Sequence, residues 1–165
     1  MIKKFCFILL ACTGLGANIQ AQQLYNEVLQ KAENVVNDPR ADEVSIKVNH
    51  FKSTALRYTK NMAFKTRESV TTQFLDLQAY YLSDFLTRFF KELSGMQDSD
   101  EKARKTCVWE YVNISVSNPL FETADKDLAE SFLKDKDNLT PFSLNTDWEK
   151  ACQALDEREQ LRKQP

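Results

Sequence analysis

Apolar side chains recur at intervals of three and four residues along most of this 165-residue chain, which is the spacing of amphipathic helices. A first helix is predicted from Gln22 to Asp38, where Pro39 ends it. A second follows with Asp42 as its N-cap, and its alternating steps of four and three form the cleanest pattern in the sequence. Its buried seam is predicted to contain Val44, Val48, Phe51, Ala55, Tyr58 and Met62.

The third predicted helix, from Glu68 to Ser94, is apolar around well over half of its circumference. Such a helix must be covered on several sides, so we expect it at the centre of the fold, with Gly95 as its C-terminal stop. Its apolar residues are Phe74, Leu75, Leu77, Tyr81, Leu82, Phe85, Leu86, Phe89 and Leu93.

The rest of the chain carries weaker helical patterns. A fourth helix is predicted from Asp100 to Ser115. At its end, apolar and polar residues alternate from Val112 to Val116 as in a strand, so this segment could be helix or strand. A short helix is predicted from Thr123 to Lys134, and Thr146 to Glu149 fits a capping box that starts a final helix. The expected fold class is therefore all-α: a single compact bundle of five or six helices, with long second and third helices.

Two proline-containing loops separate the later helices, at Asn118–Phe121 and Thr140–Leu144. Each contains large apolar side chains, so we expect both loops to be held against the bundle and to have a structural role rather than one in recognition. The side chains predicted to hold them are Leu120, Phe121, Phe142 and Leu144.

The first twenty-one residues have the order of a secretory signal peptide: a basic start, an apolar run to about Leu15, and Ala21 at an ordinary cleavage point. The run is too short to span a membrane. Cleavage after Ala21 leaves residues 22–165, a single domain of 144 residues, as a secreted or periplasmic protein without a transmembrane span. The alternative is a lipoprotein anchored through Cys12.

Two cysteines remain in the mature chain, Cys107 and Cys152. In an oxidising compartment they could form a disulfide, and closing the loop between them would contribute about 4 kcal/mol in the chain-entropy model. The alternative is a pair of small buried apolar side chains. The sequence leaves both open.

Several kinds of chemistry lack the residues they need. The single glycine of the mature chain, Gly95, excludes the glycine-rich turns of Rossmann folds, phosphate-binding loops and nucleophile elbows. One histidine and two cysteines show no zinc-ligand spacing, so we predict no metal and no cofactor. His50 lies roughly 120° from the seam of its helix and is expected to be exposed rather than catalytic.

Charge also limits the class of partner. Without the two leader lysines the chain has 20 basic and 24 acidic residues, a mildly acidic balance that argues against a nucleic-acid partner. The second helix nevertheless concentrates positive charge. Lys47, Arg57 and Lys60 could meet an acidic partner, or form a solvated face that is balanced by the acidic stretch from Glu122 to Asp137.

A second candidate site lies on the third helix. Gln78 projects into the apolar arc and must find a hydrogen-bond partner if it is buried. Gln78 and Tyr81 could also line a ligand cleft between the second and third helices.

Three segments, DLQAYYL (76–82), SVSNPLF (115–121) and TPFSLNTDWEKA (140–151), carry a resemblance to known proteins. They resemble segments of small exported helical proteins from Gram-negative gut and oral bacteria, a group without an assigned activity. The resemblance implies an exported helical architecture and transfers no catalytic residue.

Export and the lack of an assembled catalytic set together predict a non-enzymatic protein of the cell envelope or medium. We expect it to bind another protein or a cell-surface component. The alternative is a small-molecule carrier with an apolar cleft between helices.

Overall fold

The computed structural model describes residues 23–66, 70–134 and 139–163. Within these ranges the chain forms six helices and no strand, which confirms the all-α prediction. The helices are α2 (Gln23–Val36), α3 (Glu43–Thr66), α4 (Thr72–Ser94), α5 (Glu101–Ser117), α6 (Lys126–Ala129) and α7 (Trp148–Arg162). The predicted leader, residues 1–21, lies outside the described residues.

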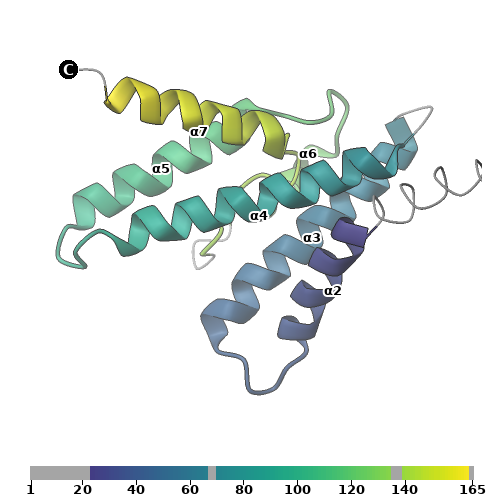
Figure 1. Cartoon of the computed structure of the whole chain (residues 1–165), viewed down its shortest axis with the longest axis horizontal. Coiled ribbons are helices and arrows are strands. Elements are labelled where there is room, and N and C mark those ends of the chain that lie inside the picture. The colour runs from purple at the N-terminus through teal and green to yellow at the C-terminus, as the bar shows by residue number, and fades with distance from the viewer. Residues whose placement is uncertain (1–22, 67–69, 135–138, 164–165) are drawn as a thin grey trace, which may run out of the picture.

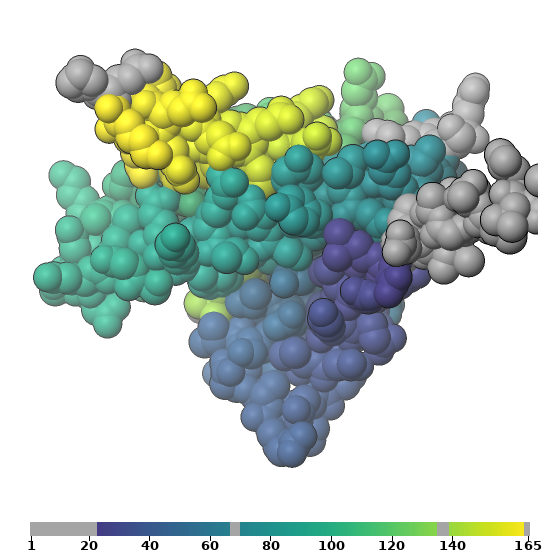
Figure 2. Space-filling view, in the orientation of Figure 1, coloured from purple at the N-terminus to yellow at the C-terminus, as the bar shows by residue number. Residues whose placement is uncertain are grey.

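Helices α2 and α3 form an antiparallel hairpin that crosses α4 and narrows to a wedge at its tip (Figures 1 and 2). The predicted cap is confirmed, because Asp42 Oδ1 accepts a hydrogen bond from the backbone N–H of Ser45 at 2.9 Å. Phe51, Ala55 and Tyr58 are buried as predicted. The prediction for Val44 is wrong, because the first turn of α3 lies at the narrow end of the hairpin and its side chain is exposed.

Helix α4 is the central element, as predicted. It packs against α2 and α3 on one side and against α5 and α7 on the other. Its polar contacts with α7 run in the same order along both helices, so these two are parallel, whereas α5 is antiparallel to α4. Leu77 is the exception to the predicted arc: it lies at the surface with 36% of its area exposed, since the neighbouring helices do not cover the whole circumference.

The ends of α4 and α5 are set by local hydrogen bonds. The Thr71 hydroxyl caps α4, and the predicted start at Glu68 lies outside the described residues. The N–H of Gly95 donates to the Lys91 and Glu92 carbonyls at 3.2 Å each and ends the helix. Helix α5 continues to Ser117, so the strand alternative for its end is wrong.

Two later boundaries also differ from prediction. The short helix is confined to Lys126–Ala129 and is followed by turns. The predicted capping box at the start of α7 is wrong: Asp147, not Thr146, is the N-cap and accepts from the N–H of Lys150, so Glu149 is not at the third helical position from which it could reach back. The Thr146 hydroxyl is instead buried 2.7 Å from the Ser115 hydroxyl, because the tertiary packing offers it a partner on α5.

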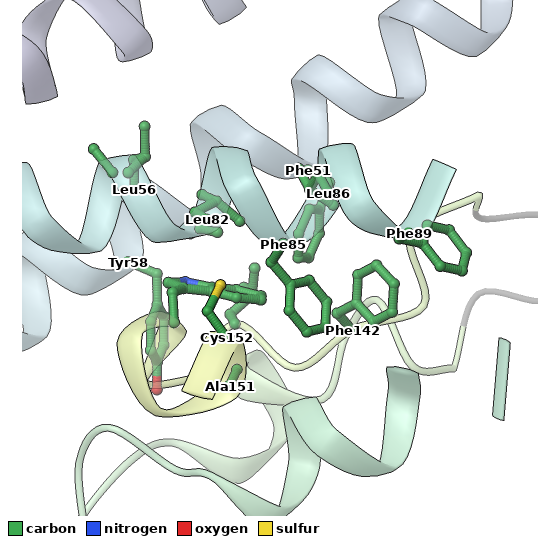
Figure 3. Close-up of a cluster of buried hydrophobic side chains, with 14 of the residues drawn as sticks. Phe51, Leu56, Tyr58, Leu82, Phe85, Leu86, Phe89, Phe142, Ala151 and Cys152 are labelled. Atoms are coloured by element: carbon green, nitrogen blue, oxygen red, sulfur yellow. The ribbon is translucent and has the colours of Figure 1, made fainter. Parts of the chain in front are cut away.

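The connection between α5 and α7 supplies part of the core. Phe121, Phe142 and Leu144 are buried, which confirms that both proline-containing loops are held against the bundle. The loops also pair with each other through the Asn145 side-chain amide, whose oxygen accepts from the Phe121 N–H at 3.0 Å and whose nitrogen donates to the Phe121 carbonyl at 2.8 Å. Phe142 lies between Phe85 and Phe89, in edge-to-face contact with both rings (Figure 3).

Candidate functional site

The three basic residues of α3 that the sequence analysis singled out have partners within the α2–α3 hairpin. Lys47 pairs with Glu43 at 2.7 Å, and the Arg57 guanidinium pairs with Glu33 of α2. The Lys60 ammonium lies over the Tyr25 ring of α2, 5.5 Å from its centroid. The acids that pair with Lys47 and Arg57 here come from α3 itself and from α2. Part of the stretch from Glu122 to Asp137 lies outside the described residues, so the expected balance by that stretch stays a prediction.

Gln78 is buried and finds the hydrogen-bond partners that its position requires. Its Nε2 donates to Asp147 Oδ1 at 3.2 Å, and its Oε1 accepts from the backbone N–H of Trp148 at 3.0 Å. One amide thus holds the first turn of α7 against α4. Tyr81 is half-buried with its ring against that of Tyr80, and its carbonyl accepts from the Cys152 thiol.

The hollows in the surface lie elsewhere. Volumes of about 560, 490 and 390 Å³ are found along α5. Neither Gln78 nor Tyr81 lines any of the three. The two predicted ligand residues are therefore neighbours of the α4–α7 interface, and the structure gives them contacts within the protein.

Cys107 and Cys152 are both buried free thiols. Cys107 lies near Glu92 of α4 and Cys152 near Tyr81, and this separation of eleven helical residues corresponds to about 16 Å. A disulfide needs Cα atoms within about 7 Å, so these two cysteines match the alternative of small buried side chains. Burial raises the pKa of the Cys152 thiol to about 12, which keeps it protonated at neutral pH.

A cluster of charges that the sequence analysis missed joins α4, α5 and α7. Arg158 and Arg162 of α7 each bond to both Glu92 of α4 and Glu110 of α5, at up to 2.9 Å. We call these four residues the ion cluster. The Tyr111 hydroxyl adds a 3.0 Å bond to Glu92. Residues from three helices meet here, so no spacing along the chain could have indicated it.

The residues of the ion cluster and the adjacent Tyr111 are held in protonation states that do not favour catalysis. Burial acts to raise the pKa of Glu92, but the hydrogen bonds from Arg162, Tyr111 and Arg158 outweigh it and hold that pKa below its usual range. Burial raises the pKa of the Tyr111 hydroxyl, and the Glu92 charge beside it acts in the same direction. A carboxylate held ionised and a phenol held neutral suit a structural clamp rather than proton transfer.

The outward face of α5 carries a second feature that the sequence analysis did not single out. Trp109 and Val116 are 63% and 49% exposed, and they belong to a line of residues spaced four, three and four apart. We call this line the α5 seam: Lys105, Trp109, Val112 and Val116. Its spacing is the one by which a helix packs against another helix, yet α5 already contacts α4 and α7 through the opposite stripe of Cys107, Tyr111 and Ser115.

A groove of about 490 Å³ runs beside the α5 seam. Its apolar lining comes from α4, from α5 and from the α5–α7 connection: Leu93, Val108, Val112, Leu133 and Pro141. Trp109 also lines it, together with charged side chains at the N-terminal end of α5 and just before it: Asp98, Glu101, Arg104 and Lys105. The arrangement offers a large protruding indole next to an apolar depression, which is how protein-binding surfaces are built.

The sequence did contain a signal for this face. Apolar residues occur on both sides of the fourth predicted helix. A helix with two apolar faces needs partners on both, which is the reasoning that placed the third helix at the centre. The structure buries one face of α5 against α4 and α7, whereas on the other face Val112 is partly buried against the core and Trp109 and Val116 are exposed.

The remaining features considered in the sequence are the histidine, a metal site and a membrane-spanning segment. His50 is exposed, as predicted, with its ring tilted against Phe132. Across the described ranges, no three metal-ligating side chains gather in one place. No described helix combines the length and hydrophobicity that a membrane crossing requires.

The chain matches no family model, no curated protein and no solved structure.

Proposed function

We propose that this protein is an exported, non-enzymatic binding protein that holds another polypeptide on the outward face of α5. The observation that carries the proposal is the exposure of the α5 seam. A tryptophan and two valines stand in helix-packing register, with Trp109 and Val116 about half exposed or more. Exposed apolar residues scattered singly need no explanation, whereas a contiguous set beside an apolar groove marks an interaction surface.

Export rests on the leader pattern of residues 1–21, which ends at Ala21. A lipid anchor at Cys12 would leave the same binding surface on a tethered protein. The carrier hypothesis has weaker support, because both ends of the Gln78 amide are bonded within the protein. Lys47, Arg57 and Lys60 of α3 likewise have partners inside the hairpin, which leaves the α5 seam as the stronger candidate for a partner.

Crosslinking capture from envelope extracts and medium of the producing organism tests the proposal. The variant Trp109→Ala should lose most of the captured protein, because the residue is the largest exposed apolar group of the seam. Phe64→Ala is the matched control, since Phe64 is 64% exposed on a different helix, α3. Both variants should keep the circular dichroism and urea midpoint of the parent, as exposed substitutions change stability by about 0.5 kcal/mol or less. Equal capture by Trp109→Ala and the parent protein would exclude this face.

A further inference from the structure

We propose that the groove beside the α5 seam binds a single-chain zwitterionic lipid of the lysophosphatidylethanolamine type. This small-molecule ligand goes beyond the polypeptide of the proposed function. Three properties of the groove support it: the apolar lining, an arginine with unused hydrogen-bond donors, and acidic and basic groups gathered at one end.

The groove has the size of a small-molecule site, and its walls are largely aliphatic. Its volume of about 490 Å³ lies within the range of about 300–1,000 Å³ that such sites occupy. The aliphatic lining comes from three parts of the fold: α4, α5 and the α5–α7 connection. Walls of this kind suit an unbranched acyl chain, which gains free energy with each methylene that it removes from water.

Charged side chains gather at one end of the groove, by the turn between α4 and α5 (Figure 1). They are Asp98, Glu101, Arg104 and Lys105. From Arg104 to Val112 the helix advances eight residues, or about 12 Å, and beyond Lys105 no charged side chain among the described residues lines the groove. A groove that is charged at one end and apolar along the rest matches a molecule with a charged head and an apolar tail.

Arg104 is placed to bind the anionic part of the head. Its side chain lines the groove and is 32% exposed. Its Nη1 donates to the Leu93 carbonyl at 3.1 Å and lies 3.3 Å from Asp98 Oδ1, which fixes one side of the guanidinium. Its Nε and Nη2 have no partner among the described residues. These two nitrogens form an edge through which arginine binds a phosphate with two parallel hydrogen bonds.

The acids at the same end favour a zwitterion over a simple anion. Asp98 pairs with Arg104, and Glu101 pairs with Lys105 at 2.6 Å, so the charges of this end balance. An anion alone would bring a new negative charge beside both carboxylates, whereas an ammonium group on the same head compensates for it. Ion pairs with exposed carboxylates contribute little, so they can exchange for the phosphate and ammonium of the ligand at small cost.

Trp109 lies on α5 between the charged end and Val112, and it lines the groove. An indole has an apolar body and one N–H donor, so it suits the boundary between a polar head and an apolar tail. Since 63% of Trp109 is exposed, its surroundings should become less polar when an acyl chain occupies the groove. Its fluorescence therefore reports binding, and the buried Trp148 gives a constant background.

Titration of the exported protein with lauroyl lysophosphatidylethanolamine, at concentrations at which the lipid is monomeric, is the test. Calorimetry should show saturable one-to-one binding, and tryptophan emission should shift to shorter wavelength. Two fragments of the ligand are the controls: glycerophosphoethanolamine, which lacks the chain, and laurate, which lacks the zwitterion. Each should bind at least tenfold more weakly than the intact lipid.

Arg104→Gln should weaken binding of the lipid at least tenfold, because it removes the charge-assisted bonds to the phosphate. The matched control is Arg40→Gln. Arg40 pairs with Asp38 in the turn between α2 and α3 and does not line the groove, so its replacement should leave the affinity unchanged. Circular dichroism and urea unfolding check that both variants fold as the parent does.

Three results would overturn the inference. They are the absence of saturable binding, an equal affinity for laurate or for the head alone, and unchanged binding by Arg104→Gln. The first two need no variant, so they hold even if Arg104→Gln does not fold. Capture of a polypeptide is tested separately with Trp109→Ala and Phe64→Ala, so the lipid site and the proposed function can fail independently.

Discussion

Replacing Phe142 by alanine should destabilise the protein severely, although the residue lies in a loop. Its side chain is fully buried and makes edge-to-face contacts with Phe51, Phe85 and Phe89, at centroid distances of 5.8, 5.2 and 5.1 Å. These rings belong to α3 and α4, so Phe142 fills the space between the hairpin and the central helix.

The magnitude follows from burial and ring contacts. Truncating a buried phenylalanine costs about 3–5 kcal/mol, and aromatic pairs add about 0.5–1.5 kcal/mol each beyond area burial. Three such pairs place Phe142→Ala at the upper end of that range, near 5 kcal/mol. A domain of ordinary size has about 5–15 kcal/mol of total stability, so the variant should lose a third of it or more.

Urea unfolding followed by far-ultraviolet circular dichroism measures the loss. The matched control is Phe64→Ala, which removes the same atoms from an exposed site and should change stability by about 0.5 kcal/mol or less. Phe142→Leu keeps much of the volume and should lose clearly less than alanine, which provides a measurable variant if Phe142→Ala does not fold. A loss below about 1 kcal/mol for Phe142→Ala would refute the assignment of this loop to the core.

Three further outcomes are expected. Ser115→Ala removes the hydroxyl that accepts the buried N–H of Ser143 at 3.0 Å and should cost about 1–3 kcal/mol in urea unfolding; an unchanged midpoint would show that this bond is dispensable. The pKa of Glu92 is depressed in the folded state, so its contribution to stability is present above the unfolded pKa and is lost as pH falls through the folded value. Below about pH 4.5 the urea midpoint should therefore fall more in the parent than in Glu92→Gln, and equal falls would contradict the account. Cys107 and Cys152 should resist a thiol reagent at neutral pH and both react after unfolding, whereas no reaction after unfolding would indicate a bridge.

Periodicity was sufficient for the long helices because the spacing of apolar residues is a local property of the sequence. Phe51, Ala55 and Tyr58 recur at helical spacing and are buried, and the apolar arc of α4 correctly indicated the central element. Asp42 caps α3 as predicted, since a cap needs only the next turn of the helix.

Partners distant in the chain could not be predicted in this way. Thr146 looked like a cap, and the neighbouring Asp147 takes that role because the packing of α5 gives the Thr146 hydroxyl a buried partner in Ser115. The ion cluster draws Glu92, Glu110 and the α7 arginines from three helices, and only their docking brings the charges within hydrogen-bond distance.

The candidate site shows the same division. The sequence by itself determined that α5 has apolar residues on two faces, because helical geometry alone assigns Tyr111 and Val112 to different sides. Which of those faces is buried was decided by the tertiary structure. Helices α4 and α7 cover the stripe of Cys107, Tyr111 and Ser115, and Trp109 is left exposed beside the groove. Apolar character is a property of the residue, whereas exposure depends on which other elements the fold brings against it.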